Sequence, residues 1–389
     1  MNDNITPYVR YIGTDDKDLD LFESQYIVPQ GISYNSYVIT DEKIAVMDTI
    51  DQRKTDEWTA RLEEALEGRT PDYLIVQHME PDHAANIGWF AEKYPEATIV
   101  ASAKAVQMMP QFFEEVNFAG RTQTVKEGDT LCLGQHTLKF IMAPMVHWPE
   151  VMLTYEESEK ILFSADAFGK FGALCREGEW TNEARRYYFN IVGKYGAQVQ
   201  ALLKKAAGLD IAMICPLHGP VLKENLGYYI GLYDTWSKYE PETEGVVVAY
   251  ASIHGNTAAA ARRMAEILNE KGVAEVMLID LCRDDMALAV ESAFRYSKMI
   301  VAASSYDAGV FPPMFDFLHH LQIKNFQKRR VGIIENGSWA PTAGRVMSCM
   351  FSEMKSMEIM EHTVTIKSSM KKADLLQMEE LAEELLATE

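Results

Sequence analysis

The stretch Gln77–His83, with the sequence QHMEPDH, holds four side chains that can bind a metal ion, at positions 78, 80, 82 and 83. It follows the short apolar run Tyr73–Gln77, which is typical of a buried strand, and it precedes a predicted helix near Ala84. Loops at strand ends are where an α/β scaffold presents functional groups. One histidine in such a loop would be an ordinary polar residue, but two histidines and two carboxylates in six positions predict a metal site.

Three further ligand-type residues stand where predicted strands pass into loops. His147 lies in MVHWPE, after a strand that ends near Met142. Asp166 ends the apolar run in LFSADAF, and His218 follows another apolar run in CPLHGP. Because strand ends of one domain meet at a common edge, we expect all seven side chains to converge on one rim.

The other histidines and the cysteines carry no such signal. His319 and His320 lie in a predicted helix, whereas His136 and His362 precede strands and lack acidic neighbours. The cysteines are far apart, form no CxxC pair and lie in apolar or mixed segments, so we expect buried free thiols. They are Cys132, Cys175, Cys215, Cys282 and Cys349.

The pattern changes beyond the charged linker Lys238–Glu244, so we predict two domains, residues 1–243 and 244–389. In the second domain, five strand-like runs alternate strictly with helical patterns, which predicts a doubly wound parallel sheet. The predicted strands are Val246–Tyr250, Glu275–Asp280, Met299–Ala303, Val331–Glu335 and Val364–Lys367. The helical patterns begin at Thr257, Met286, Pro313, Thr342 and Lys371.

Three loops at the carboxyl ends of these strands predict a cofactor crevice. The first, in YASIHGNT, opens a helix and offers hydroxyl, amide and backbone donors for a phosphate. The other two carry large aromatic side chains that can flank a flat ring. The predicted cofactor residues are Ser252, Ile253, His254, Gly255, Asn256, Thr257, Ser304, Tyr306, Asp307, Ala308, Gly309, Phe311, Asn336, Gly337, Ser338 and Trp339.

Composition limits the classes of partner. The 389 residues include 37 basic and 57 acidic side chains, a net charge of −20 that repels nucleic acid and anionic membranes. We expect a cytoplasmic protein, since the start of the chain resembles no signal peptide and no run approaches about 18 apolar residues. Without a GxGxxG signature, FMN is favoured over NAD or FAD.

The order HxExDH, a single His, a strand-end Asp and a His before Gly resembles the metallo-β-lactamase superfamily. The zinc hydrolases of that superfamily carry HxHxDH, whereas this chain has Glu80, and a carboxylate favours iron over zinc. Together with Trp148–Pro149, the YFNI of Tyr188–Ile191 and the Phe311–Pro313 segment, this pattern resembles the flavodiiron proteins over nearly the whole chain.

This resemblance implies an α/β fold, with an N-terminal αβ/βα metallo-β-lactamase-like sandwich and a C-terminal flavodoxin-like five-stranded parallel sheet. It implies two iron ions, one bound by His78, Glu80 and His147 and the other by Asp82, His83 and His218. Asp166 would bridge them, and direct binding by His83 stays open.

The implied activity is reduction of dioxygen to water, or of nitric oxide to nitrous oxide, with FMN passing electrons from rubredoxin or a similar carrier. The resemblance also implies a head-to-tail homodimer or a dimer of dimers, and leaves the substrate and donor open. One alternative is a metallohydrolase fused to a flavodoxin domain, although a hydrolase has no use for a flavin. Another is an electron-carrier scaffold whose first domain is catalytically silent.

Overall fold

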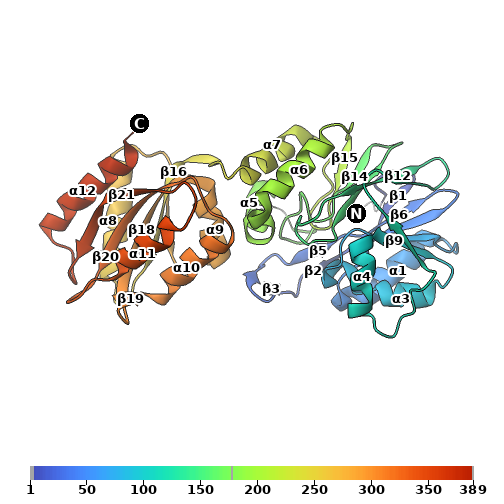
Figure 1. Cartoon of the computed structure of the whole chain (residues 1–389), viewed down its shortest axis with the longest axis horizontal. Coiled ribbons are helices and arrows are strands. Elements are labelled where there is room, and N and C mark those ends of the chain that lie inside the picture. Colours follow the sequence, from blue (N-terminus) through green and yellow to red (C-terminus); the bar gives the residue numbers. More distant parts are fainter. Residues whose placement is uncertain (1–3, 177, 388–389) are drawn as a thin grey trace. The chain divides into compact units, whose positions relative to one another are not determined.

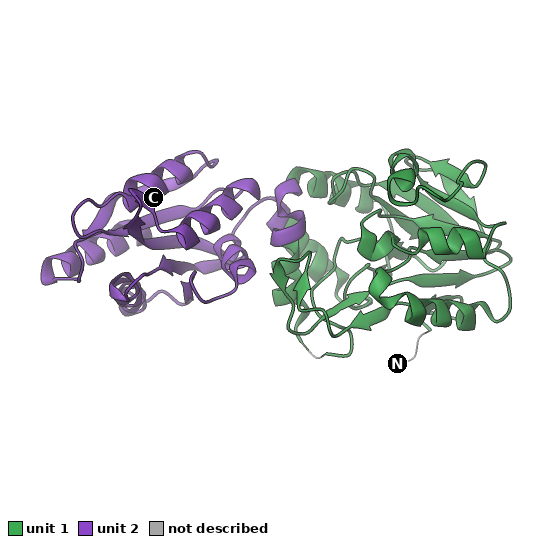
Figure 2. Cartoon of the chain, turned by 90° about the horizontal axis from the view of Figure 1, so that it is seen from below, with its two compact units in different colours: residues 1–188, 197–234 green, residues 189–196, 235–389 purple. Residues whose placement is uncertain are grey.

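The computed structural model describes residues 4–176 and 178–387, which form two compact units. Unit 1 comprises Met1–Tyr188 and Ala197–Asp234, and unit 2 comprises Phe189–Gly196 and Thr235–Glu389 (Figure 2). The segment Phe189–Gly196 belongs with unit 2 because the Phe189 ring stacks on Phe294, with centroids 4.3 Å apart. The division predicted at residues 243 and 244 stays a prediction.

Unit 1 contains two sheets that face each other (Figure 1). The first has the order β1-β6-β7-β8-β9-β10 and the second has the order β11-β12-β13-β14-β15. Buried apolar side chains from both, such as Ile75 and Phe140, form one shared core. The strands of the two sheets are β1 (Val9–Tyr11), β6 (Tyr37–Thr40), β7 (Ile44–Met47), β8 (Tyr73–Val76), β9 (Thr98–Ser102), β10 (Thr122–Val125), β11 (Thr130–Cys132), β12 (Thr137–Met142), β13 (Met152–Glu156), β14 (Ile161–Phe163) and β15 (Met213–Cys215).

Two short antiparallel pairs and a set of helices complete this unit. The pairs are β2 (Thr14–Asp16) with β5 (Ile32–Tyr34), and β3 (Leu21–Phe22) with β4 (Tyr26–Ile27). The helices are η1 (Gln52–Lys54), α1 (Thr55–Leu66), α2 (Pro81–Ala84), α3 (Ile87–Lys93), α4 (Ala103–Phe112) and α5 (Trp180–Tyr187). A π-helical turn η2 (Tyr188–Val192), η3 (Gly193–Tyr195), α6 (Gly196–Ala206) and α7 (Leu226–Ser237) follow, and they span the division between the units.

Unit 2 has the predicted doubly wound sheet, in the order β17-β16-β18-β20-β21, with all neighbouring pairs parallel. Helices α8 and α12 pack together, and α10 packs against α9 and α11 (Figure 1). The elements are β16 (Thr243–Ala251), α8 (Asn256–Glu270), β17 (Val276–Asp280), α9 (Met286–Arg295), β18 (Tyr296–Tyr306), β19 (Gly309–Val310), α10 (Pro312–Ile323), β20 (Arg330–Asn336), α11 (Ala343–Ser352), β21 (Glu358–Ile366) and α12 (Lys372–Leu386).

Two details differ from the sequence expectations. The last strand begins at Glu358 and not at Val364. Its first half mixes the apolar Ile359 and Met360 with exposed Glu358, Glu361 and His362, and it lies at the edge of the sheet, so it gives no continuous apolar run. The cysteines are free as expected, but only Cys215 is buried, whereas Cys132, Cys175 and Cys349 are exposed. Local hydropathy fails here because exposure depends on which face of an element packs against its neighbours.

Arg329, directly before β20, forms hydrogen bonds with two other segments of unit 2, one near Tyr239 and one at residues 294–296. Its buried guanidinium donates to the carbonyls of Tyr296 at 2.7 Å and Tyr239 at 2.8 Å, and also to the carbonyl of Phe294. Burial lowers the pKa of this guanidinium to about 10, and the carbonyls stabilise its charge.

We predict that Arg329→Ala destabilises unit 2 by more than about 3 kcal/mol, because several buried carbonyls lose their donor. Arg329→Lys should cost less, since an ammonium group can still donate three hydrogen bonds. Urea unfolding followed by circular dichroism measures both. An alanine variant within about 0.5 kcal/mol of wild type would contradict this role, since that is the range of neutral surface changes.

Candidate metal centre and cofactor crevice

The seven ligand-type residues converge in unit 1, as the sequence predicts. Four come from the loop and short helix directly after β8, and the others follow β12, β14 and β15. The cluster therefore combines strand ends of both sheets, so it depends on the packing of one sheet against the other. The side chains form two groups: His78, Glu80, His147 and Asp166 in one, and Asp82, His83 and His218 in the other.

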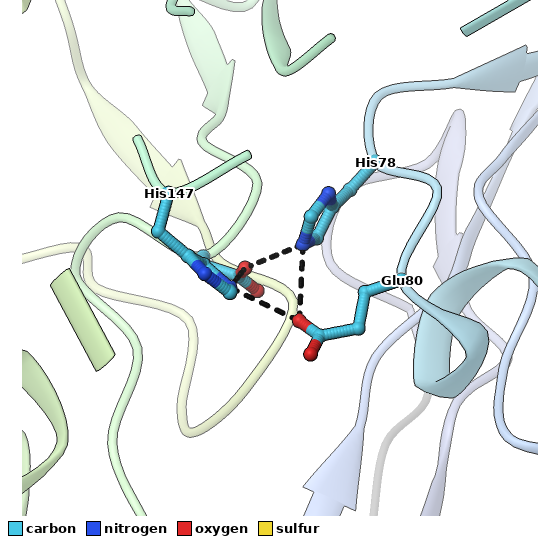
Figure 3. Close-up of side chains that lie close together, drawn as sticks. His78, Glu80 and His147 are labelled. Atoms are coloured by element: carbon cyan, nitrogen blue, oxygen red, sulfur yellow. Dashed lines mark hydrogen bonds and ion pairs between the residues drawn. The ribbon is translucent and has the colours of Figure 1, made fainter. Parts of the chain in front are cut away.

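The first group is held around two carboxylate oxygens (Figure 3). His78 Nε2 lies 3.2 Å from Glu80 Oε2 and 3.1 Å from Asp166 Oδ2. His147 Nε2 lies 3.0 Å from the same Glu80 oxygen and 3.1 Å from the same Asp166 oxygen. Two imidazole nitrogens and two carboxylates thus point at one small volume.

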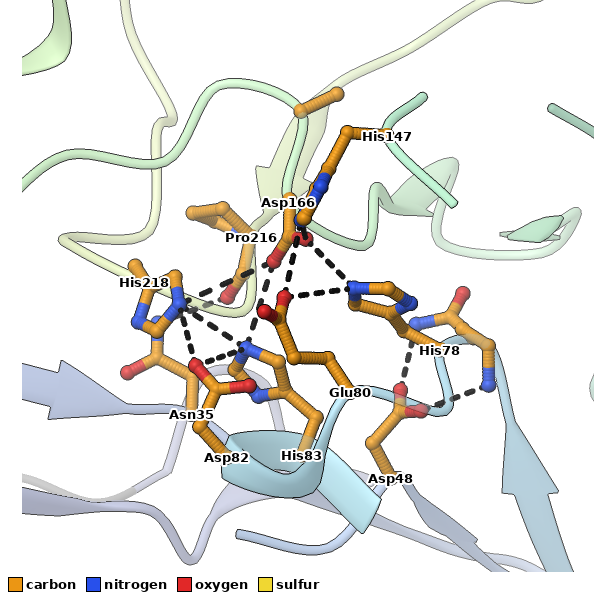
Figure 4. A network of polar contacts seen from close by, with 12 residues as sticks. Asn35, Asp48, His78, Glu80, Asp82, His83, His147, Asp166, Pro216 and His218 are labelled. Atoms are coloured by element: carbon orange, nitrogen blue, oxygen red, sulfur yellow. Dashed lines mark hydrogen bonds and ion pairs between the residues drawn. The ribbon is translucent and has the colours of Figure 1, made fainter. Parts of the chain in front are cut away.

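The second group has the same character (Figure 4). Asp82 Oδ2 lies 3.3 Å from His83 Nε2 and 3.2 Å from His218 Nε2. The two Nε2 atoms are themselves 3.0 Å apart. Two ring nitrogens at this separation need either a shared proton or a cation between them.

Asp166 connects the groups, because its two oxygens face different sets of histidines. Oδ2 faces His78 and His147, whereas Oδ1 lies 3.4 Å from His83 Nε2 and 3.9 Å from His218 Nε2. The side chain is 1% exposed, and neither oxygen accepts a hydrogen bond from a described residue. A buried carboxylate in this state requires nearby positive charge.

These residues fit a pair of metal ions. Two ligand atoms that each lie about 2.1 Å from a metal, at angles between 90° and 110°, are about 3.0–3.4 Å apart. The separations within each group have this size. Both oxygens of Asp82 and both of Asp166 are buried without a hydrogen-bond donor among the described residues. A ligand set that mixes imidazole nitrogens with several carboxylates suits iron, whereas zinc sites of this kind are richer in histidine.

The electrostatics of the first group favour positive charge. Burial alone would lower the pKa of His147, but the carboxylates of Asp166 and Glu80 beside its ring raise that pKa to about 9. Burial would raise the pKa of Glu80, but His147 and His78 lower it. The cluster therefore stabilises added protons or cations.

Residues outside the two groups orient the histidine rings. Glu150 Oε1 accepts a hydrogen bond from His78 Nδ1 at 2.8 Å and from the Met79 amide at 2.8 Å. His218 Nδ1 donates to the Ser33 carbonyl at 2.7 Å. Each bond leaves Nε2 with its lone pair directed into the cluster. His83 Nδ1 has no such acceptor among the described residues, so its ring is held less firmly.

The sequence expectation missed Glu150. A signal existed, since Glu150 follows His147, Trp148 and Pro149 directly, and an acid close to a metal ligand often accepts a hydrogen bond from a ligand histidine. The Ser33 carbonyl is a backbone group, which no residue pattern reveals.

The expectation that His136 and His362 lack acidic neighbours was wrong. His136 Nδ1 lies 2.8 Å from Asp41 Oδ2, and His362 Nδ1 lies 2.8 Å from Glu384 Oε2. Neither histidine belongs to the metal groups. His319 is exposed and His320 is partly exposed, as expected.

Unit 2 has a crevice of about 570 Å³ at the carboxyl ends of its strands. Most of the predicted cofactor residues line it, but Gly255, Gly309 and Phe311 do not. The sequence expectation omitted four further lining residues: Ser305, Ala340, Thr342 and Ser368.

One end of the crevice suits a phosphate. Gly255 precedes α8 with φ of +88°, a conformation that favours glycine, and α8 has no side-chain cap. An anion at the start of α8 could therefore accept hydrogen bonds from the first backbone amides of this helix and from the Thr257 hydroxyl. The Thr257 hydroxyl lies 2.9 Å from Ser304 Oγ. Tyr306 and the 91% exposed Trp339 provide aromatic surface for a flat ring. This arrangement fits FMN.

Comparisons with known proteins agree with both units. Residues 32–219 match the family described as ODP family beta lactamase. The chain is similar to the rubredoxin oxygen:oxidoreductase of Desulfovibrio gigas, with a TM-score of 0.92, 25% identity and coverage of 98% of this chain and 97% of the other. It is similar in fold to the flavodiiron protein of Giardia intestinalis, with a TM-score of 0.91, 24% identity and coverage of 99% and 97%.

A curated relative extends this likeness. The anaerobic nitric oxide reductase flavorubredoxin of Aliivibrio salmonicida is 29% identical over 354 residues, which are 87% of this chain and 70% of that protein. Among the described residues, no helix is long and apolar enough to cross a membrane.

Because Glu150 orients His78, we predict that Glu150→Ala weakens metal binding by about 10- to 100-fold. Glu150→Gln should lose less, since its amide oxygen can still accept the His78 hydrogen bond. Competition with a chelator, on protein loaded with ferrous ion without oxygen, measures the affinity. Wild-type affinity in the alanine variant would show that His78 needs no such support.

Proposed function

This chain belongs to the flavodiiron protein family, and we propose that it reduces dioxygen to water, nitric oxide to nitrous oxide, or both. It is an oxidoreductase of that family. Experiment must decide which of the two gases it reduces. We propose that residues of unit 1 hold two iron ions and that the crevice of unit 2 holds FMN.

The observation that supports the proposal most strongly is the position of Asp166 between two groups of histidines. A carboxylate that reaches two ligand sets serves a paired metal centre, and the carboxylates among the ligand-type residues suit iron better than zinc. Bound together, two irons and FMN can supply the four electrons that dioxygen needs to become two waters, or the two electrons that join two nitric oxides into nitrous oxide.

The chain's own residues contribute binding and orientation. His78, Glu80 and His147 would hold one iron, and Asp82, His83 and His218 would hold the other. Asp166 would neutralise part of the charge of both. Glu150 keeps the His78 ring in the tautomer that presents Nε2.

In unit 2, the start of α8 and Thr257 would bind the FMN phosphate by hydrogen bonds. Tyr306 and Trp339 would contact the flavin ring. These contacts position the cofactor without any charged side chain of the phosphate loop.

We further propose that rubredoxin, or a carrier like it, supplies the electrons, and that the working unit is a head-to-tail homodimer or a dimer of dimers. Two similar proteins carry names that include rubredoxin or flavorubredoxin. Twofold pairing is also the commonest oligomeric arrangement. A cytoplasmic location stays a prediction.

The direct test is to purify the protein without oxygen, measure its iron and flavin, and follow gas consumption with reduced rubredoxin as donor. About two irons and one FMN per chain, with uptake of dioxygen or production of nitrous oxide, would support the proposal. Zinc without flavin, together with hydrolytic activity, would instead support a metallohydrolase.

Because Asp166 is the side chain that faces both ligand groups, we predict that Asp166→Ala loses at least one iron and nearly all gas reduction. Asp166→Asn should behave similarly, since its amide NH2 cannot bind a metal. FMN content should stay at the wild-type level, because the flavin residues lie in the other compact unit. Iron analysis and flavin absorbance give the two values, and full iron in both variants would overturn the assignment.

A composite site predicts complementation between inactive variants. Asn256→Asp sets a carboxylate beside the FMN phosphate, so repulsion should weaken flavin binding. If the FMN of one chain serves the irons of its partner, mixing this variant with Asp166→Ala should restore some activity through subunit exchange. Heterodimers that form but recover no activity would favour electron transfer within one chain.

A further inference from the structure

Two loops beside the crevice carry exposed positive charge and no acidic residue. Residues 336–352, which include the loop after β20, contain no Asp or Glu, and neither do residues 362–373, which include the loop after β21. This is unusual for a chain whose net charge is −20. Four exposed basic side chains, here called the basic rim, lie in these stretches: Arg345, Lys367, Lys371 and Lys372.

Hydrogen bonds hold the two loops together. Ser338 Oγ lies 2.9 Å from Ser368 Oγ, and Asn336 Nδ2 donates to the Ser368 carbonyl at 2.8 Å. The Gly337 amide donates to the Ile366 carbonyl at 3.0 Å. Ser338, Asn336 and Ser368 all line the crevice, so the lysines next to Ser368 stand at its border.

The charge of the basic rim is not neutralised locally. Lys371 Nζ donates to the carbonyls of Lys367 at 2.7 Å and Ser369 at 2.6 Å, which fixes its ammonium group on the loop. In the part of the chain that the structure describes, none of the four basic side chains forms an ion pair. The four side chains therefore give this part of the surface a positive electrostatic potential.

The basic rim is remote from the phosphate end of the crevice. The phosphate loop follows β16, whereas the lysines follow β21, and β18 and β20 lie between these strands. At a strand spacing of about 4.8 Å, this separation is about 14 Å. The lysines thus lie on the side of the crevice opposite the FMN phosphate, and that phosphate does not account for them.

Apolar surface accompanies the charge. Trp339, in the loop after β20, is 91% exposed, and Leu376 is 62% exposed one helical turn after Lys372. Large aromatic side chains are frequent among the residues that contribute most to binding a protein partner.

From this juxtaposition we propose that the basic rim, with Trp339, is the docking surface for a small acidic electron-carrier protein that reduces the flavin. The inference rests on the proposed function, which requires FMN in the crevice and an external donor. The net charge of −20 repels an acidic carrier from most of the surface, whereas the basic rim attracts it to the border of the crevice. Two reduced one-electron carriers each give up one electron, and two protons from water accompany them to the flavin.

The test uses the FMN-loaded full chain and reduced rubredoxin, an acidic carrier, mixed without oxygen in a stopped-flow instrument. In the variant Lys367→Glu/Lys371→Glu/Lys372→Glu, the second-order rate of flavin reduction at low ionic strength should fall at least ~10-fold. The decrease of this rate with added salt, expected for wild type, should disappear or reverse.

A matched control makes the same change of charge elsewhere on unit 2. Lys271, Lys298 and Lys355 lie near the amino-terminal ends of strands, at the opposite edge of the sheet. At an ionic strength of about 0.1 M, the variant Lys271→Glu/Lys298→Glu/Lys355→Glu should keep the reduction rate within about twofold of wild type. The added charges lie at the other end of the strands, about 25 Å from the rim, and the Debye length is then only about 10 Å. A photoreduced deazaflavin, which is small and needs no docking surface, should reduce the flavin equally fast in wild type, the rim variant and the control variant.

Three results would overturn the docking surface: an unchanged rubredoxin rate in the rim variant, an equal loss in the control variant, or an equal loss with deazaflavin. A milder variant with glutamine at positions 367, 371 and 372 gives the same comparison if the glutamate variant is unstable. Wild-type protein that binds no FMN would instead remove the proposed function, and the docking surface with it.

Discussion

The whole metal centre depends on one carboxylate that is buried between two sets of imidazoles. Asp166 has no hydrogen-bond donor among the described residues, yet it is almost completely removed from water. Such a group is costly to bury unless positive charge surrounds it. Its two oxygens face different groups of histidines, so positive charge is needed on both sides of the carboxylate. The seven ligand-type residues therefore form two neighbouring groups and not a single one.

The scaffold meets this requirement by bringing strand ends from two sheets together. The loop after β8 supplies four ligands from the first sheet, and β12, β14 and β15 supply the others from the second. The geometry of the centre therefore depends on the apolar core between the sheets, in which Ile75 and Phe140 are fully buried. Unit 2 uses a related solution, since parallel strands also collect their loops at one edge, where the crevice lies.

Much of this arrangement could be predicted from sequence because its signals are local. HxExDH after an apolar run, and strict alternation of strands and helices, each depend on neighbouring residues. The failures involve partners distant in the chain. Glu150 supports His78 from 72 positions away, and Asp41 pairs with His136 across 95 positions. The exposure of Cys132 and Cys349, and the mixed exposure of the first half of β21, likewise depend on which surfaces are covered in the folded chain.

The central claim is that Asp166 and the two histidine groups would hold a pair of iron ions, and Mössbauer spectroscopy of protein loaded with ⁵⁷Fe tests it most directly. Two ferric ions held as a close pair that shares oxygen ligands would couple their spins antiferromagnetically. The oxidised protein should therefore show a diamagnetic ground state, together with about two irons per chain. Spectra in applied field would then show no magnetic splitting from isolated ions. A magnetically isolated ferric ion at full occupancy, with one iron per chain, would contradict the account.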